Sequence, residues 1–170
     1  MNDLHGRAIT YLRLSVTDLC DLRCIYCMPE GGVQKHTHGE MCSLEELRDM
    51  TAAAVQLGVR KVRVTGGEPL VRRGIVELCR MLRDIPGLEE LCLTTNGVLL
   101  PALAKPLRDA GVDRLNISLD TLRADRYRAI TRVGNLSDVL RGLEAAEAAG
   151  FQNTKINCVL MGGVNDDEIG

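Results

Sequence analysis

The sequence predicts an α/β fold, a partial (βα)6 barrel of the TIM type, with five parallel strands present and the C-terminal part of the barrel missing. Two observations predict it. Strand-like stretches alternate with helical stretches, the order that builds a parallel sheet covered by helices. A helix, a glycine and then a β-branched or aromatic residue recur ahead of three strands, at Gly58, Gly111 and Gly150. An open doubly wound sheet has the same alternation and is the alternative.

The first half of the chain contains two expected strands around a long loop. Residues 9–17 predict the first strand, and the polar residues 18–42 predict a loop. Ser43 and Glu46 form a capping box, so a helix is expected from there to Leu57. Residues 61–65 predict the second strand, and a helix over 74–84 ends before Pro86.

The second half repeats this unit. The expected elements are a strand over 91–95, a helix over 99–110, a strand over 114–119, helices over 124–131 and 136–149, and a strand over 155–161. Asn165 and Glu168 match the start of a sixth helix, yet the sequence stops at Gly170. We therefore expect residues 1–170 to form a single domain that is truncated at its C-terminal end.

Composition narrows the function classes. The chain has 170 residues, a net charge of −2 and only four aromatic side chains, which argues against nucleic acid as a partner. The sequence lacks an apolar run long enough to span a bilayer, and its first residues lack the apolar core of a signal peptide. We expect a cytoplasmic protein without membrane contact, in a compartment where thiols stay reduced.

Three cysteines follow the first strand in a C-x3-C-x2-C run, Cys20, Cys24 and Cys27. A [4Fe–4S] cluster takes four ligands, so three thiolates would leave one iron open for chemistry. The alternative is a structural zinc site completed by His36 or His38, because zinc accepts three cysteines and a histidine. The spacing alone leaves both open.

Gly66-Gly67-Glu68-Pro69 follows the second strand, at the end where barrel enzymes place their sites. Two glycines let the backbone approach a ligand closely, and a carboxylate there can hold an ammonium group. The alternative is a tight turn with a solvated glutamate. Thr94 and Ser118 lie at other strand ends, where hydroxyls can bind ribose or carboxylate groups.

Three cations, Arg13, Arg63 and Lys155, lie within predicted strands. Charges inside barrel strands are costly unless they are paired or bound to an anion. Together they favour a polyanionic substrate such as a nucleoside triphosphate. The alternatives are ion pairs with Glu68 and Asp120, or outward orientation.

Three other cysteines fall in predicted helix or strand positions, where we expect buried packing residues. They are Cys79, Cys92 and Cys158.

These motifs together resemble the radical S-adenosylmethionine (SAM) superfamily, in which C-x3-C-x2-C with an aromatic residue before the last cysteine is followed one βα unit later by Gly-Gly-Glu-Pro. Within it, the chain is similar to the GTP 3′,8-cyclase family of molybdenum cofactor (molybdopterin) biosynthesis. The matching segments are 13–20, 62–69, 93–97, 116–120 and 155–161. That family is roughly twice as long and carries a second cluster in its C-terminal half.

The resemblance implies a radical SAM core domain and a lyase that converts GTP to (8S)-3′,8-cyclo-7,8-dihydroguanosine 5′-triphosphate, with a [4Fe–4S] cluster and SAM as cofactors. It implies that the cluster is held by the catalytic, metal-binding cysteines Cys20, Cys24 and Cys27. It implies contacts to SAM from Tyr26 and Gly67 through backbone, from the Ser118 side chain, and from Glu68 to the methionine amino group. It implies that GTP is bound by Arg13, Arg63, Thr94 and Lys155.

The resemblance also implies partners: GTP, an electron donor, the downstream pterin-forming enzyme and a possible second copy in a homodimer. Since the second cluster is absent from this sequence, we expect the chain alone not to cyclise GTP. Two alternatives stay open, a radical SAM enzyme acting on another substrate such as a peptide, and a zinc-stabilised binding module.

Overall fold

The computed structural model describes residues 2, 4–32 and 41–169, and its centre is one five-stranded sheet. The strands are β1 (Tyr11–Ser15), β2 (Lys61–Thr65), β3 (Glu90–Thr95), β4 (Arg114–Ser118) and β5 (Lys155–Asn157). They lie in chain order and every neighbouring pair is parallel. A doubly wound sheet would reverse its strand order at a switch point. The continuous order confirms the α/β fold with barrel-type winding.

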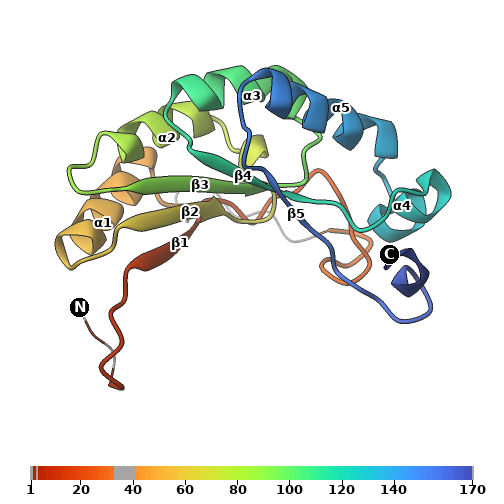
Figure 1. Ribbon diagram of the computed structural model, residues 1–170, viewed down its shortest axis with the longest axis horizontal. Coiled ribbons are helices and arrows are strands. Elements are labelled where there is room, and N and C mark those ends of the chain that lie inside the picture. Colours follow the sequence, from red (N-terminus) through yellow and green to blue (C-terminus); the bar gives the residue numbers. More distant parts are fainter. Residues whose placement is uncertain (1, 3, 33–40, 170) are drawn as a thin grey trace.

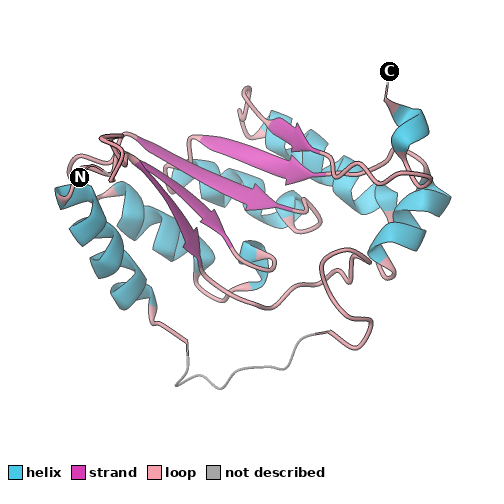
Figure 2. Ribbon diagram, turned by 90° about the horizontal axis from the view of Figure 1, so that it is seen from below, coloured by secondary structure: helices cyan, strands magenta, loops and turns pink. Residues whose placement is uncertain are grey.

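Helices cover one face of the sheet. They are α1 (Leu44–Gln56), α2 (Ile75–Arg83), α3 (Leu100–Asp109), α4 (Ala124–Thr131) and α5 (Leu136–Ala148), with two 3-10 turns, η2 (Pro69–Val71) and η3 (Asp166–Glu168). Figure 1 shows α2, α3 and α5 on the same side of the strands, and Figure 2, seen from below, shows the strands in front of the helices. In the described part of the chain, no helix is long and apolar enough to cross a membrane.

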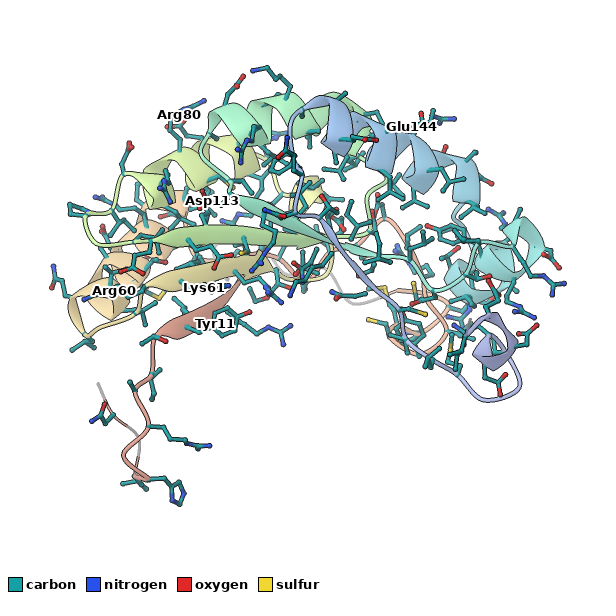
Figure 3. The ribbon with its side chains drawn as sticks, viewed as in Figure 1. Tyr11, Arg60, Lys61, Arg80, Asp113 and Glu144 are labelled. Atoms are coloured by element: carbon teal, nitrogen blue, oxygen red, sulfur yellow. The ribbon has the colours of Figure 1, made fainter. Side chains whose placement is uncertain are left out.

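The two faces of the sheet differ in chemistry because side chains alternate along a strand. On the helix side, β2 to β4 contribute fully buried apolar residues, among them Val62, Val64, Leu91 and Leu115. The alternate positions form what we call the polar sheet face. It comprises Tyr11, Arg13, Ser15, Lys61, Arg63, Thr65, Glu90, Cys92, Thr94, Arg114, Asn116, Ser118, Lys155 and Asn157. In Figure 3, Tyr11 and Lys61 point away from the helices.

The helix predictions are largely confirmed, including the Ser43–Glu46 capping box of α1 and the full extent of α4. The first and fifth strands are shorter than predicted, with five and three residues. The predicted start of a sixth helix is a single 3-10 turn, η3. Asn165 precedes this turn without capping it, because its Oδ1 accepts from the amide of Met161 (2.7 Å) while its Nδ2 donates to the carbonyl oxygens of Asp120 (2.7 Å) and Val159 (2.9 Å). These contacts turn the chain away from the sheet after β5.

Gly142 shows how tightly α5 packs on the turn after β3. A Cβ at this position would overlap the carbonyl oxygen of Gly97. Alanine normally stabilises a helix relative to glycine, by about 1 kcal/mol. Here the overlap must push α5 outwards, so we expect Gly142→Ala to lower the free energy of unfolding by about 2 kcal/mol in urea denaturation. Gly162→Ala is the control, since no atom lies within 4 Å of its Cβ. Equal stability of the two variants would contradict this packing.

Candidate active site

The carboxyl ends of the parallel strands lie at one edge of the sheet, where their turns meet the loop that follows β1. We call residues 18–32, the part of that loop that carries the three cysteines, the cysteine loop. Hydrogen bonds join it to the turns after three other strands. This edge is where (βα) barrels carry their active sites.

The glycine pair after β2 lies directly under the start of the cysteine loop. The amide of Gly67 donates to the carbonyl oxygen of Thr17 (2.7 Å), and the amide of Glu68 donates to that of Leu19 (2.7 Å). A Cβ on Gly66 would overlap the Thr17 oxygen, and one on Gly67 would overlap the Leu19 oxygen. Only glycine permits this close approach of two backbones.

Glu68 is buried, with 1% of its surface exposed, so the alternative of a solvated glutamate is wrong. Its carboxylate accepts hydrogen bonds from the amide of Leu70 (3.0 Å), the hydroxyl of Thr95 (2.8 Å) and the amide of Asn96 (2.7 Å). Burial raises the pKa of Glu68 to about 7, although these hydrogen bonds oppose the shift. A carboxylate has about four acceptor positions, so one remains for a further donor.

Cys20, Cys24 and Cys27 are all free thiols; the first two are half-buried and the third is exposed. The amides of Cys27 and Met28 both donate to the carbonyl oxygen of Cys24 (3.0 Å each), which folds the Cys24–Cys27 segment into one turn. Burial raises the pKa of Cys20 to about 11, and it also raises that of Cys24. Binding a metal here must therefore displace protons.

In the chain as described, no three His, Cys, Asp or Glu side chains converge on a single metal position. The donor set nevertheless fits an iron–sulfur cluster: three thiols on one short loop, supported from below by a turn without side chains. His36 and His38, the extra ligands of the zinc alternative, lie outside the described residues.

Tyr26 connects the cysteine loop to the end of β4. Its hydroxyl donates to Oδ2 of Asp120 (2.8 Å), a residue that is 7% exposed. Burial and this carboxylate raise the pKa of Tyr26. The family resemblance predicted a backbone contact from Tyr26 to SAM, and the hydrogen bond of its side chain was not predicted. Ser118, the last residue of β4, lies at the same edge and pairs in register with Asn157 of β5.

The predicted anion-binding cations lie on the polar sheet face. Arg13 and Arg63 are directly opposite each other in register on β1 and β2, and Lys155 begins β5. Among the described residues, none of the three forms an ion pair, so their predicted alternative pairing with Glu68 and Asp120 is wrong. The Nε of Arg63 is buried without a hydrogen-bond partner in this part of the chain.

A second polar row crosses the sheet beside these arginines. Thr94 of β3, Asn116 of β4 and Lys155 of β5 are in register. Asn116 is 3% exposed, and its Oδ1 finds no hydrogen-bond partner within the described ranges. The structure thus brings all four predicted substrate residues onto one face. Three buried polar atoms of this face have no hydrogen-bond partner among the described residues: the Nε atoms of Arg63 and Arg114 and Oδ1 of Asn116.

Sequence analysis missed an ion-pair cluster on the same face. Glu90 forms ion pairs with Lys61 and, at 2.6 Å, with Arg114, while the Cys92 thiol donates to Glu90 at 3.1 Å. These cations lower the pKa of Glu90, against the effect of desolvation. One signal in the sequence could have indicated this cluster: Lys61 and Arg63 are two residues apart in one strand, so both side chains lie on the same face of the sheet. Cys79 and Cys92 are buried as predicted, but Cys158 is exposed, because it lies just after β5, whose three residues are themselves all exposed.

The family model of the radical SAM superfamily matches residues 14–170. The chain belongs to the radical SAM superfamily. The resemblance seen in its motifs is therefore confirmed, and membership implies the expected cofactors, a [4Fe–4S] cluster and SAM.

The radical SAM chain is 60% identical over 167 residues to the GTP 3′,8-cyclase of Geobacter sulfurreducens, covering 98% of this chain and 51% of that protein. It is 57% identical over 167 residues to the GTP 3′,8-cyclase of Pseudomonas entomophila, covering 98% and 50%. The chain thus spans about half the length of the curated relatives it matches.

Solved structures share its fold. HydG, a maturase of the [FeFe]-hydrogenase, superimposes with a TM-score of 0.73 at 17% identity, covering 88% of this chain and 35% of HydG. SuiB of Streptococcus suis bound to S-adenosylmethionine gives a TM-score of 0.70 at 19% identity, covering 87% and 32%. At these identities the likeness concerns the fold.

The raised pKa of Glu68 predicts a pH dependence of stability. The folded chain holds this proton up to a pKa of about 7, above the ordinary value of 4.5. Stability from this group is therefore complete below pH 4.5 and falls as pH rises towards 7. Between pH 5 and 8 we expect a loss of about 2 to 3 kcal/mol in the free energy of unfolding.

The measurement is urea denaturation of the metal-free parent and of Glu68→Gln at pH 5 and pH 8. Glutamine removes the titrating group, so the stability of the variant should fall less across this range than that of the parent. Parallel pH curves would show that Glu68 does not hold its proton in the fold.

Proposed function

We propose that this chain provides the cofactor site and part of the substrate site of a radical SAM lyase that cyclises GTP through C3′ and C8, in molybdenum cofactor biosynthesis. The observation that carries the proposal is the pair Arg13 and Arg63, opposed in register and without an acidic partner among the described residues, with the buried Nε of Arg63 unsatisfied. The 60% identity to a GTP 3′,8-cyclase supports the choice of GTP.

In this proposal Cys20, Cys24 and Cys27 hold a [4Fe–4S] cluster, which would leave its fourth iron for SAM. The cluster and SAM, when bound, supply the one-electron cleavage that produces a carbon radical able to take the 3′ hydrogen of GTP. The protein contributes orientation and exclusion of competing groups. A reactive radical takes any nearby hydrogen atom, so small errors of position are costly.

The turn after β2 and the cysteine loop would hold SAM. Backbone groups of Gly67 and Tyr26 contact it, as does the hydroxyl of Ser118. Glu68 accepts a hydrogen bond from the methionine ammonium with its remaining acceptor position. A cation placed there favours the ionised carboxylate, so it would lower the raised pKa of Glu68.

The polar sheet face would hold the triphosphate. Glu90 already neutralises Lys61 and Arg114 through its ion pairs. Arg13, Arg63 and Lys155 are left with charge available for phosphate oxygens, which guanidinium groups bind with two parallel hydrogen bonds. The Thr94 hydroxyl, in the neighbouring row, contributes a further contact to GTP.

We assign residues 1–170 to one radical SAM core domain. Its relatives are about twice as long, so we do not expect turnover of GTP from these residues alone. We further propose that the protein receives its electron from a donor, forms a homodimer and works ahead of a downstream pterin-forming enzyme. The free thiols of the described chain favour a cytoplasmic location, where cysteines stay reduced.

Cluster binding is tested by anaerobic reconstitution with iron and sulfide. We expect about four iron and four sulfide per chain and a brown protein. Cys24→Ser removes one of three ligands and should lose most of the iron, whereas Cys42→Ser, which changes an exposed thiol outside the motif, should retain it. A colourless parent that binds only zinc would overturn the proposal in favour of a binding module.

GTP binding is tested by equilibrium dialysis of the reconstituted chain. Arg63→Ala removes a charged hydrogen-bond donor worth about 1.5–3 kcal/mol, so we expect the Kd for GTP to rise about tenfold or more. Arg80→Ala is the control, because Arg80 lies on α2, points outwards from the helices and, of the residues described, pairs only with Glu77. Unchanged GTP binding by Arg63→Ala, with the cluster intact, would favour another substrate such as a peptide.

A further inference from the structure

The cysteine loop has a second support, at the C-terminal end of α4. The amide of Arg23 donates to the carbonyl oxygen of Thr131 (3.1 Å), and the amide of Ile25 donates to that of Ile130 (2.9 Å). The last carbonyls of a helix lack partners within it, so these bonds satisfy both segments. Figures 1 and 2 both show α4 beside this loop.

Arg132, the residue after α4, contacts both ends of the Cys24–Cys27 segment. Its Nη1 donates to the carbonyl oxygen of Arg23 (2.9 Å) and to that of Met28 (3.0 Å). Arg23 directly precedes Cys24, and Met28 directly follows Cys27. One guanidinium nitrogen therefore fixes the distance between the two ends of the turn that carries these thiols.

The backbone of Arg132 is strained to make this contact. Its φ of 63° and ψ of −39° lie outside the regions that side chains favour, and no other non-glycine residue in the described ranges has a positive φ. Strain of this kind persists where surrounding contacts enforce it, and it concentrates at functional sites. A glycine would fit this backbone more easily, so the contacts of the guanidinium group account for the arginine.

We infer that Arg132 is a positioning residue for the cluster ligands: it clamps the ends of the Cys24–Cys27 turn so that both thiols face one site. The inference rests on the proposed function, because it takes these thiols as cluster ligands. Tyr26, bound to Asp120, holds the middle of the same turn. The turn is thus fixed at both ends and at its centre by residues distant in sequence.

The contact is tested first in the metal-free protein, by hydrogen–deuterium exchange of the peptide that contains the Arg23 and Ile25 amides. Arg132→Gly removes the guanidinium and relieves the strain, so it should melt no lower than the parent while this peptide exchanges about tenfold faster. Arg128→Gln, on the same helix, removes an exposed guanidinium that donates to the carbonyl oxygen of Gly134 (3.4 Å), and this variant should exchange like the parent. Unchanged exchange in Arg132→Gly would overturn the inference.

The role in cluster positioning is tested by electron paramagnetic resonance of the reconstituted, reduced proteins during titration with SAM. We expect Arg132→Gly to need about tenfold more SAM than the parent for the same spectral change. Arg132→Lys keeps the charge and a hydrogen-bond donor, so it should need an intermediate amount of SAM. If Arg132→Gly melts lower than the parent, the comparison of Arg132→Lys with the parent tests the positioning role instead. Spectra and titrations equal to those of the parent would overturn the inference.

The two proposals fail in different ways. A parent that binds no iron overturns the proposed function, and the positioning role with it, before any variant is compared. A parent that binds the cluster while the Arg132 variants behave identically overturns the positioning role alone.

Discussion

The candidate site depends on a steric constraint, the contact between two stretches of backbone that leaves no room for a Cβ. Gly66 and Gly67 lie directly against the carbonyl oxygens of Thr17 and Leu19, and their turn donates hydrogen bonds to the same segment. This contact sets the height of the cysteine loop above the sheet edge. Any side chain here would lift the loop away from Glu68 and from the ends of the other strands.

Electrostatics divides the polar sheet face into two regions. Around Glu90 the charges of Lys61 and Arg114 are compensated within the fold. Around Arg13 and Arg63 no described acidic group does the same, although the Nε of Arg63 is buried. Uncompensated charge beside unsatisfied polar atoms is unfavourable in the folded chain alone, and a bound anion would relieve it.

The sequence predicts those features that depend on short-range patterns. The alternation of strands and helices gives the sheet, the Ser43–Glu46 box gives the start of α1, and Gly66-Gly67 marks the strand end that carries the site. Such patterns do not predict how deeply a side chain is buried or which hydrogen bonds join residues distant in sequence. Tyr26 and Asp120 are 94 residues apart, and Arg132 and Arg23 are 109 apart, so nothing local indicates either contact. Asn165 is a residue type typical of helix caps, but its side chain binds the amide of Met161 and the carbonyl oxygen of Asp120, which is 45 residues away.

Because side chains alternate along each strand, one face of the sheet packs against the helices while the other carries the polar groups of the candidate site. Apolar positions such as Val62 and Leu115 anchor the helices, while their neighbours in sequence project from the opposite side. A single replacement on the polar sheet face can therefore alter ligand preference without changing the apolar contacts that hold the helices. Solved structures that share only 17% and 19% identity with this chain, at TM-scores of 0.73 and 0.70, illustrate that the backbone persists while most side chains change.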